Sequence, residues 1–579
     1  MGSRENHSYT NISLTVFSEI GITQKKHPFT MSQANQSFPN QTQPLPLHEL
    51  LSRLLKSEKT SHRHPLPIMG TLQDLNQALE RRTFLDFLNA SLRGIGQVGF
   101  ANNPISGLLI TLAVFLQSPW TALMLVIGVV VATWTAYLMN LDRPSIRNGI
   151  FGLNGALVGL ALGTFGAWGN GSGNWLWVVA AIICAALSTV LMEYLGLWMA
   201  VRLGLPSMGV PFQIVTYSFL IIALYIPQPF FQIGAPPPFP NPVESLDGLG
   251  ILSSLITGVG QIFFSGSLVS ALLIIIALAL CSPMGALVGS LGSAIGLLVG
   301  IIVGVDFNLV YAGLLGYNSA LTAISIGGIF YAPNRRSILF ACGGALGAAV
   351  IEWLLILAFA PLGLPILAVS FHLGTYACFL ILRRSLSSLV PVAPYSIACP
   401  EEHRFRYLTA KEAISGFRRQ LQSAMQGQHH KVFFEQAPLE IKEDLRYIFN
   451  AIDRDQSGSL SLTEMSYHLQ QSGHPMSDEE LNFLFSSMDA DNSGQIDFEE
   501  FGELLLRHRR LMSRLDEFAT YFIPIDQDGN GVLEAEEMNV VLASVDEPPF
   551  SQEELAFLQG RIRGKELTWE KFLELLLVI

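Results

Sequence analysis

Acidic and hydroxyl side chains recur at fixed spacing near the C-terminal end of the chain, where they could bind a metal ion. A twelve-residue calcium loop needs side-chain oxygens at positions 1, 3 and 5, glycine at 6, a backbone carbonyl at 7 and glutamate at 12. Three stretches meet these requirements, beginning at Asp453, Asp489 and Asp526. Their starts are almost evenly spaced along the chain, a regularity that scattered acidic turns do not have. The sequence therefore predicts three calcium-binding loops.

The spacing assigns the calcium ligands position by position. They are Asp453, Asp455, Ser457, Ser459 and Glu464 in the first loop, Asp489, Asp491, Ser493, Gln495 and Glu500 in the second, and Asp526, Asp528, Asn530, Val532 and Glu537 in the third. A fourth hand is expected at residues 553–572, but Gly560 at position 1 and Lys571 at position 12 predict that it pairs without binding metal. Residues 441–579 resemble the calmodulin-like EF-hand superfamily, a soluble helical domain with Ca²⁺ as its ligand.

The middle of the chain has the opposite character, because it is apolar and carries little charge. The whole chain is 50% hydrophobic and 14% charged, yet few Asp, Glu, Lys or Arg residues lie between Asn103 and Arg383. A helix needs about 20 apolar residues to cross a hydrocarbon layer of about 30 Å. The uncharged centres of such runs are residues 123–137, 175–191, 214–225, 268–280, 295–305 and 338–351. We therefore predict an all-α polytopic membrane protein, followed by the soluble domain.

Three pairs of polar residues recur in the same order in the two halves of this membrane body. The pairs are Gln97 and Gln261, Asn154 and Asn318, and Glu193 and Glu352. The glutamines and the asparagines have the same separation along the chain, and the glutamates have one that is only slightly shorter. Collinear matches of this kind indicate an internal duplication, which decides the architecture. We expect a channel domain of residues 81–385, with repeat one at residues 82–228 and repeat two at residues 246–384.

Two segments rich in glycine, residues 149–163 and 309–328, occupy corresponding positions in the two repeats. Interrupted segments in such positions indicate a substrate site near the middle of the bilayer, since irregular backbone must be covered by protein or line a cavity. We predict about five transmembrane helices and one re-entrant helix per repeat. An odd number of crossings inverts the second repeat and returns both termini to one side, and the flanking arginines favour the cytoplasmic side.

The polar groups expected along the pore are amides rather than charges. Amides both donate and accept hydrogen bonds, which suits a small neutral solute better than an ion. The alternative for Gln97 and Gln261 is a hydrogen bond between helices, worth about 0.6 kcal/mol. Phe100 and Phe264 follow these glutamines by three residues, on the same helix face. They either form an aromatic slot for a flat molecule or contact lipid and core.

Glu193 and Glu352 are carboxylates inside apolar helices, where a charge costs at least about 2.5 kcal/mol. They must therefore be paired, neutral or hydrogen-bonded to a helix end. Two roles are open, anchoring the ends of the re-entrant helices and contacting the solute directly, and we favour the anchoring role.

The motifs of the membrane body resemble those of the urea transporter family over roughly residues 82–383. The matching segments are Gly96-Gln97-Val98, residues 102–107, Leu153-Asn154-Gly155, Cys281-Ser282-Pro283 and Tyr317-Asn318-Ser319-Ala320-Leu321-Thr322. The resemblance implies a homotrimer in a lipid bilayer, with one pore of two inverted halves per protomer, passing urea downhill in single file. It also implies urea binding by Gln97 and Gln261, a ladder of backbone carbonyls, and apolar walls from Phe100, Phe264, Leu157 and Leu321.

The chain departs from the family signature Leu-Pro-x-x-Thr-x-Pro-Phe at its threonine. Gly209 stands there in the first repeat and Ala368 in the second, so two pore-lining hydroxyls are missing. Our leading interpretation is a passive urea channel that responds to calcium. The alternatives are the same fold conducting ammonia, water or a urea analogue, and a membrane-anchored calcium sensor without transport.

The remaining segments are polar. Residues 1–80 are expected to form a flexible arm without a signal peptide, and residues 386–440 a basic connector that is either a solvated linker or a helix gripped by calcium-loaded hands. We expect a multi-pass protein of a plasma or bacterial inner membrane, with the N-terminus and the EF-hand domain cytoplasmic. The five cysteines lack the spacing of a disulfide framework. The net charge of −12 argues against nucleic acid, and the absence of a nucleophile–base pair, phosphate loop or zinc spacing argues against an enzyme.

Overall fold

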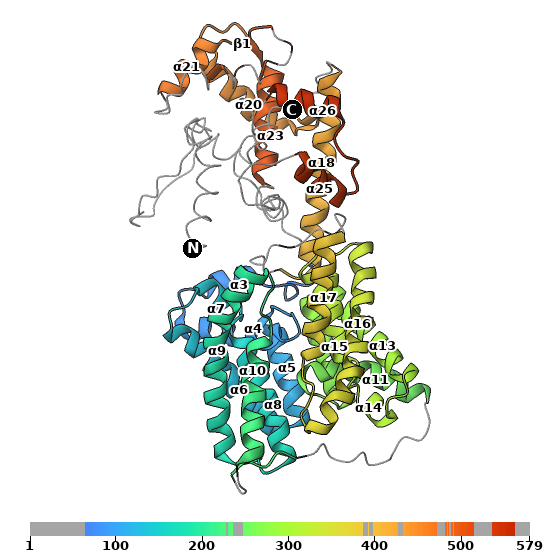
Figure 1. Cartoon of the computed structure of the whole chain (residues 1–579). Coiled ribbons are helices and arrows are strands. Elements are labelled where there is room, and N and C mark those ends of the chain that lie inside the picture. The colour runs from blue at the N-terminus through green and yellow to red at the C-terminus, as the bar shows by residue number, and fades with distance from the viewer. Residues whose placement is uncertain are drawn as a thin grey trace, which may run out of the picture. The chain divides into compact units, whose positions relative to one another are not determined.

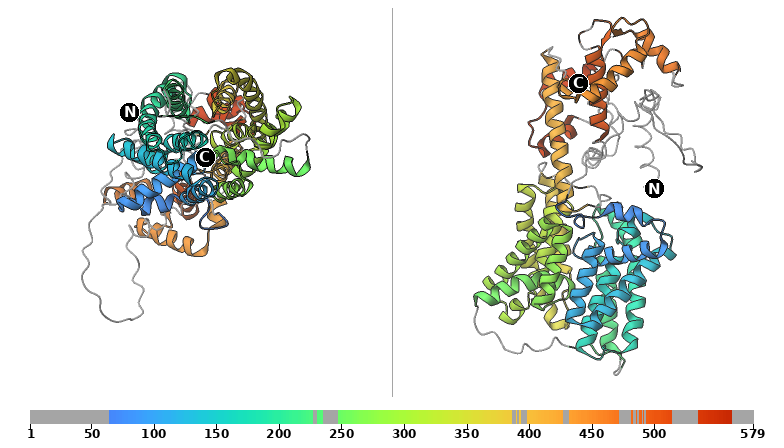
Figure 2. Two further views of the ribbon diagram at one scale, coloured as in Figure 1. Left: turned by 90° about the horizontal axis from the view of Figure 1, so that it is seen from below. Right: turned by 180° about the vertical axis from the view of Figure 1, so that it is seen from behind.

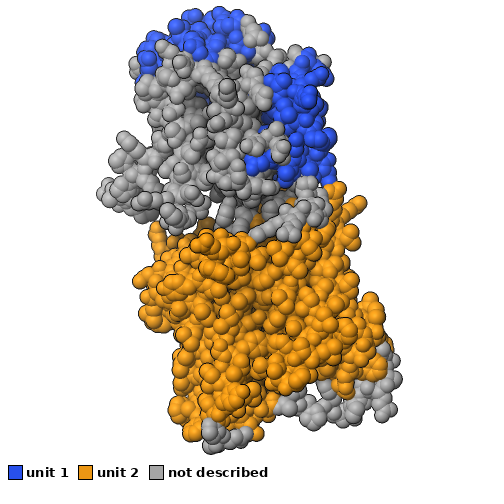
Figure 3. All heavy atoms as spheres, in the orientation of Figure 1, with its two compact units in different colours: residues 1–60, 409–579 blue, residues 61–408 orange. Residues whose placement is uncertain are grey.

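The computed structural model describes residues 64–226, 230–234, 247–385, 389, 392, 398–426, 432–471, 481–482, 485, 488–489, 491, 493–513 and 535–561. The chain divides into two compact units, one of residues 61–408 and one that contains residues 409–579 (Figure 3). Residues 1–63, most of the predicted N-terminal arm, lie outside the described residues.

The unit of residues 61–408 is built from helices, which are labelled in Figure 1. They are α3 (Gln73–Ala78), α4 (Thr83–Gln97), α5 (Pro104–Gln117), α6 (Pro119–Leu138), α7 (Arg143–Arg147), α8 (Gly152–Trp168), α9 (Trp175–Leu203), α10 (Val210–Tyr225), α11 (Gly248–Gly260), η1 (Gln261–Phe263), α12 (Leu268–Cys281), α13 (Pro283–Ile302), α14 (Phe307–Tyr311), α15 (Tyr317–Ile324), η2 (Ser325–Ile329), α16 (Arg335–Phe359), η3 (Ala360–Leu362) and α17 (Val369–Ser385). The predicted all-α class is confirmed.

The starts of several helices repeat between the two halves of this unit. Asn103 caps α5 and Ser267 caps α12, while Ser118 caps α6 and Ser282 caps α13. In each case the side-chain oxygen accepts a backbone N–H that has no partner inside the helix. The members of each pair have the same separation along the chain as the paired glutamines. The duplication seen in the sequence therefore extends to the local signals that begin the helices.

Helices α4 to α10 pack mainly on one another, and α11 to α17 form a second group, as the two views of Figure 2 show. The groups are joined where α5 packs against α12. In the first group, a Cβ atom added at Gly128 of α6 or at Gly155 of α8 would collide with the carbonyl of the other glycine. Such close backbone approach through small residues is typical of helix association in membranes.

Four helices of the described part are long and apolar enough to cross a membrane: α6, α9, α13 and Arg335–Leu362. Gly248–Phe263 and Leu268–Cys281 form a pair bent by 71°, which adds a fifth span if the pair is one broken crossing. Shorter apolar helices are Pro104–Gln117, Gly152–Trp168, Val210–Tyr225 and Val369–Leu382. These helices support a multi-pass membrane protein.

The two glycine-rich segments, which the sequence analysis predicted to hold re-entrant helices, are largely helical. Residues 152–168 form the continuous helix α8, and α15 continues into the π-helical turn η2. Their glycines allow close packing, because a Cβ at Gly159 would collide with the carbonyl of Met124, and one at Gly316 would lie 2.5 Å from the hydroxyl oxygen of Ser293. In both segments, glycine therefore permits close contact with neighbouring helices.

The described part of the second unit is also helical, and it contains one short pair of strands. Its elements are α18 (Pro400–Met425), which starts in the first unit, α19 (Val432–Gln436), α20 (Leu439–Ile452), β1 (Ser459–Leu460), α21 (Leu462–Gln471), β2 (Ile496–Asp497), α23 (Phe498–Ser513), α25 (Ala535–Ser544) and α26 (Gln552–Arg561). The strands are antiparallel, pairing Leu460 with Ile496. Both of these side chains are fully buried against Phe449 and Ile448 in one core.

Candidate functional site

A cavity of about 1580 Å³ lies within the unit of residues 61–408 and is lined from both groups of helices. Eight of the predicted pore residues line it: Gln97, Phe100, Leu157, Gly209, Gln261, Phe264, Leu321 and Ala368. The carboxylates Glu193 and Glu352 line it as well. The predicted pore residues Asn154 and Asn318 are fully buried behind the lining.

The two glutamines occupy equivalent positions and make equivalent contacts. Gln97 ends α4, and its side-chain nitrogen donates to the carbonyl of Asn148 at 3.1 Å. Gln261 follows α11, and its side-chain nitrogen donates to the carbonyl of Ala312 at 2.7 Å. Each amide nitrogen is thus fixed by backbone, which orients the amide oxygen as an acceptor for a solute N–H.

Phe100 and Phe264 reach the cavity by a turn and not by helical spacing. Their φ angles are 60° and 55°, in the left-handed region that side chains other than glycine rarely adopt. Such conformations persist at sites that need a particular side-chain direction. The rings join others, since the centroid of Phe100 lies 6.1 Å from that of Phe371 and the centroid of Phe264 lies 6.0 Å from that of Phe165.

Asn154 and Asn318 hold the segments that carry the altered signature positions. The Asn154 side chain donates to the carbonyl of Met208 at 3.2 Å, and that of Asn318 donates to the carbonyl of Leu367 at 3.1 Å. Met208 and Leu367 precede Gly209 and Ala368 and have φ angles of 45° and 53°. The asparagines are therefore positioned to fix two strained turns at the cavity wall.

The two acidic side chains differ in environment. Glu193 is half-buried at the cavity. Glu352 is 1% exposed, and its Oε1 accepts a hydrogen bond from Asn318 at 2.8 Å. Its Oε2 has no hydrogen-bond partner among the described residues. Glu352 therefore holds the side chain of Asn318 on α15 and also lines the cavity.

His372 on α17 is a cavity residue that the sequence analysis missed. Its Nε2 accepts from the N–H of Gly209 at 3.1 Å, so Nδ1 carries the proton and donates to the carbonyl of Ala368 at 2.6 Å. The side chain of Gln213 lies 3.2 Å from the same Nδ1. A Cβ atom added at Gly209 would lie 3.3 Å from the ring. The imidazole of His372 therefore contacts both Gly209 and Ala368, the two positions that lack the family threonine.

Two tyrosines connect the halves of the unit reciprocally. Tyr217 on α10 donates to the carbonyl of Pro365 at 2.8 Å, and Tyr376 on α17 donates to the carbonyl of Pro206 at 2.8 Å. The separation of the two tyrosines along the chain equals that of the two prolines. Each half therefore holds the Leu-Pro segment of the other.

The first calcium loop has the geometry that a hard cation needs. The carboxylate oxygens of Asp453, Asp455 and Glu464 lie within 4.8 Å of one another. Gly458 has a φ angle of 81°, and its N–H donates to Asp453 at 2.9 Å, which closes the turn. Hydrogen bonds from Ser457 lower the pKa of Asp455, so this carboxylate is charged at neutral pH. Converging carboxylates of this kind fit Ca²⁺.

The second loop repeats this arrangement. Asp489, Asp491 and Glu500 place carboxylate oxygens within 4.8 Å of one another, and Gly494 has a φ angle of 77°. The Ser459 hydroxyl of the first loop donates to the Gln495 side chain of the second at 2.6 Å. The loops are thus paired through side chains as well as strands.

The third loop is mostly outside the described residues, and of its predicted ligands only Glu537, on α25, is described. Asp526, Asp528, Asn530 and Val532 remain sequence predictions, as does the loop of the fourth hand from residue 562 onward.

Part of the predicted connector forms helix α18, which packs against the later hands. The apolar residues of α18 that are buried in this unit are Ala410, Ile414, Phe417 and Leu421. Arg418 is also buried and donates to Glu554 of α26 at 3.1 Å, while Ser415 donates to Glu547 at 2.6 Å. Burial raises the pKa of Glu554, but hydrogen bonds from Ser551, Gln422 and Arg418 outweigh it and lower the pKa. This part of the connector is therefore not a solvated linker.

Comparison with known proteins divides the chain in the same way. A family model described as urea transporter matches residues 88–383, and one described as EF-hand domain pair matches residues 442–506. Urea transporter 1 of Ovis aries is 34% identical over 356 residues, covering 60% of this chain and 88% of the relative. The Rattus norvegicus protein of the same name is 32% identical over 359 residues, covering 60% and 90%. Calcium-dependent protein kinase 22 of Oryza sativa subsp. japonica is 36% identical over 101 residues, 17% of each chain.

Proposed function

The chain belongs to the urea transporter family and carries an EF-hand pair after its membrane body, and on this premise we propose that it conducts urea passively through the cavity of residues 61–408. One observation carries the proposal. Two glutamine amides and two phenylalanine rings line a single cavity of about 1580 Å³ from equivalent positions of the two halves. The activity is movement down a gradient, without catalysis.

The chemistry of the cavity residues suits urea. Urea is flat and neutral, and it needs acceptors for its N–H groups and donors for its oxygen. Because backbone carbonyls hold the amide nitrogens of Gln97 and Gln261, the amide oxygens are available to accept from urea. The apolar walls for its flat faces are assigned to Phe100, Phe264, Leu157 and Leu321.

We assign the middle of the path to Gly209, Ala368 and His372. The imidazole bonds to the N–H of Gly209 and to the carbonyl of Ala368, so both ring nitrogens are engaged, and the ring fills space beside the two positions that lack a hydroxyl. Asn154 and Asn318 act from behind the wall as positioning residues, since they hold the turns that present these groups.

Stopped-flow light scattering on proteoliposomes tests the transport proposal. Urea entry well above that of protein-free liposomes is expected, and entry equal to that background would refute it. One alternative is that the same fold conducts ammonia, water or a urea analogue. Gly209 and Ala368 favour it, because they stand where the family signature has threonine and so change the residues along the path. Measuring these solutes in the same vesicles decides between them. Specific binding of calcium without any solute flux would support the sensor reading.

We assign Ca²⁺ to the loops that begin at Asp453, Asp489 and Asp526, and we assign its effect on transport to helix α18. EF-hands of the sensor type change the angle between their helices on binding calcium. The buried face of α18 and its ion pair between Arg418 and Glu554 give the hands a helix to act on. Urea flux is expected to differ between calcium and chelator, and equal flux with demonstrated calcium binding would refute regulation alone.

The oligomer and orientation are also proposed. A homotrimer with one pore per protomer is expected, in a plasma or bacterial inner membrane, with the N-terminus and the EF-hand domain cytoplasmic. The proposed domains are a channel at residues 81–385, a connector at 386–440 and EF-hands at 441–579. Native mass measurement tests the trimer, and protease protection in sealed vesicles tests the orientation of the EF-hands.

A further inference from the structure

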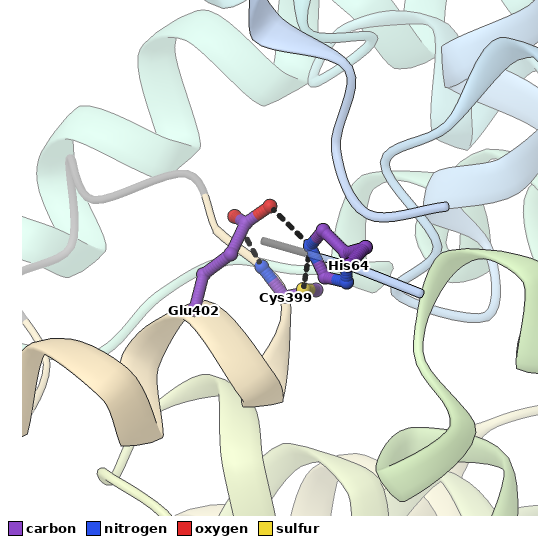
Figure 4. Close-up of side chains that lie close together, drawn as sticks. All are labelled: His64, Cys399 and Glu402. Carbon is purple, nitrogen blue, oxygen red and sulfur yellow. Dashed lines mark hydrogen bonds and ion pairs between the residues drawn. The ribbon is translucent and has the colours of Figure 1, made fainter. Parts of the chain in front are cut away.

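A cluster of three metal-binding side chains lies in the unit of residues 61–408, outside the cavity and the calcium loops. It comprises His64, which precedes α3, and Cys399 and Glu402 at the start of α18 (Figure 4). One ligand atom from each residue lies within 4.8 Å of the others. Because His64 and Cys399 stand at opposite ends of this unit in the sequence, spacing along the chain gives no sign of this cluster.

The three side chains point at one another, as Figure 4 shows, and they converge on a single ring nitrogen. His64 Nε2 lies 3.2 Å from Glu402 Oε1 and 4.0 Å from Cys399 Sγ. In a tetrahedral zinc site with ordinary bond lengths, nitrogen and oxygen ligands are about 3.4 Å apart, and nitrogen and sulfur about 3.6 Å. The distance from His64 to Glu402 is about 0.2 Å shorter than the first of these values, and the distance from His64 to Cys399 is about 0.4 Å longer than the second, so small movements of the side chains would suffice.

Burial and supporting hydrogen bonds fix the cluster. The side chains of His64 and Glu402 are 10% and 17% exposed, and Cys399 is buried. The Thr71 hydroxyl donates to Glu402 at 3.0 Å, and the N–H of Cys399 donates to the other carboxylate oxygen at 3.1 Å. Thr71 is held in turn by Arg93, which donates to its carbonyl at 2.6 Å. Partners of this kind orient metal ligands and tune metal affinity.

A hydrogen bond with a purely structural role would explain the contact between His64 and Glu402, but it would not explain the position of Cys399. Such a contact needs a donor and an acceptor, but it gives no reason for a buried sulfur directed at the same nitrogen. An imidazole, a thiol and a carboxylate around one point form a ligand set that Zn²⁺ prefers, whereas Ca²⁺ takes oxygen ligands.

We propose that His64, Cys399 and Glu402 bind a zinc ion, with water in the fourth position. The ion joins the residues before α3 to the first turn of α18. Because metal bound only by the folded form stabilises that form, zinc holds this junction closed.

Zinc content of the full-length protein tests the proposal. The detergent-purified chain is saturated with calcium, so that the EF-hand loops do not take zinc, and then dialysed against trace zinc. About one zinc per chain is expected for wild type and for Cys342→Ser, which changes a half-buried cysteine on α16. Cys399→Ser and His64→Ala are expected to lose it. Wild type without zinc, or full zinc in Cys399→Ser, would overturn the proposal.

Two further measurements remain decisive if a variant folds poorly. X-ray absorption of wild type should contain one sulfur neighbour at about 2.3 Å from zinc, and a spectrum with only nitrogen and oxygen neighbours contradicts the assignment. Thr71→Ala keeps all three ligands and is expected to weaken zinc binding by about 10- to 100-fold, as supporting residues do. Unchanged affinity in Thr71→Ala would show that adventitious zinc was measured.

Discussion

Introducing threonine at position 209 tests the assigned middle of the path most directly. Gly209 has a φ angle of −93°, so the backbone accepts a side chain there. The obstacle is His372, because an added Cβ would lie 3.3 Å from its Cε1 and 3.4 Å from its Nε2. Threonine carries two more atoms beyond Cβ, and these have room only if the ring moves.

The cost follows from the hydrogen bonds that hold the ring. Moving His372 breaks its bonds to the N–H of Gly209 and to the carbonyl of Ala368. At about 1 kcal/mol each, the loss is about 2 kcal/mol of folding stability, whereas permeability depends on the barrier that urea meets, in which about 1.4 kcal/mol corresponds to about tenfold in rate. Because the displaced ring lines the cavity, we expect Gly209→Thr to lower urea permeability by about tenfold or more.

A double-mutant cycle separates this mechanism from general damage. Gly209→Thr, His372→Ala and the double variant are reconstituted at equal protein content, and urea entry is measured by stopped-flow light scattering. The double variant is expected to recover to within about threefold of His372→Ala, since the added side chain then fills the space left by the ring. The assignment of His372 would be refuted if the reduction of urea flux in the double variant equalled the product of the two single reductions, or if Gly209→Thr had normal flux.

Three other predictions concern separate parts of the chain. Gln97→Ala should lower urea flux about 2- to 10-fold, which corresponds to the loss of one hydrogen bond to urea. The control variant Gln77→Ala, on the exposed face of α3, should leave the flux unchanged. Equal flux in the two variants would show that Gln97 does not bind urea. Glu500→Gln should abolish calcium binding by the second loop in calorimetry and reduce the calcium dependence of flux, and unaltered binding would contradict the ligand assignment. Arg418→Ala should destabilise the EF-hand unit by about 2–4 kcal/mol in denaturant unfolding, because it leaves a buried carboxylate unpaired, while exposed Arg419→Ala should cost little. Glu554, the partner of Arg418, has a lowered pKa in the folded state. Its contribution to the free energy of unfolding is therefore present above about pH 4.3 and is lost as the pH falls further. A free energy of unfolding that does not change with pH in that range would contradict this pairing.

The sequence predicted best what is local. A calcium loop is set by twelve consecutive residues, and the first two loops place Asp453 and Asp489 with the carboxylates that spacing assigned to them. The sequence singled out Gln97 and Gln261 because they occupy equivalent positions in the two repeats, and both line the cavity. It gave no sign of the left-handed turn that directs the neighbouring phenylalanines. Helical spacing placed the phenylalanines on the helix face of the glutamines, whereas the structure brings them to the cavity wall by a left-handed turn.

Contacts between the halves could not be predicted in this way. His372 meets Gly209 from the other half of the membrane body. His372 and Gln213 stand directly after the two copies of the signature segment, but this equivalence does not reveal the contact. Asn154 and Asn318 were predicted to line the pore because polar residues in apolar segments are conspicuous, yet both are used to hold backbone carbonyls behind it. Backbone groups inside a membrane need hydrogen-bond partners within the protein, so a polar side chain there can be engaged by the backbone and not be available to a solute.

The reciprocal tyrosines bear on how fast solute can pass. A carrier moves one half against the other in every cycle, which limits its turnover to the microseconds or milliseconds of a domain motion. Here Tyr217 and Tyr376 cross in opposite directions, so a rocking movement in either sense pulls on both hydroxyl bonds together. Such a frame favours a permanently formed path, in which throughput rises with concentration gradient and depends only weakly on temperature.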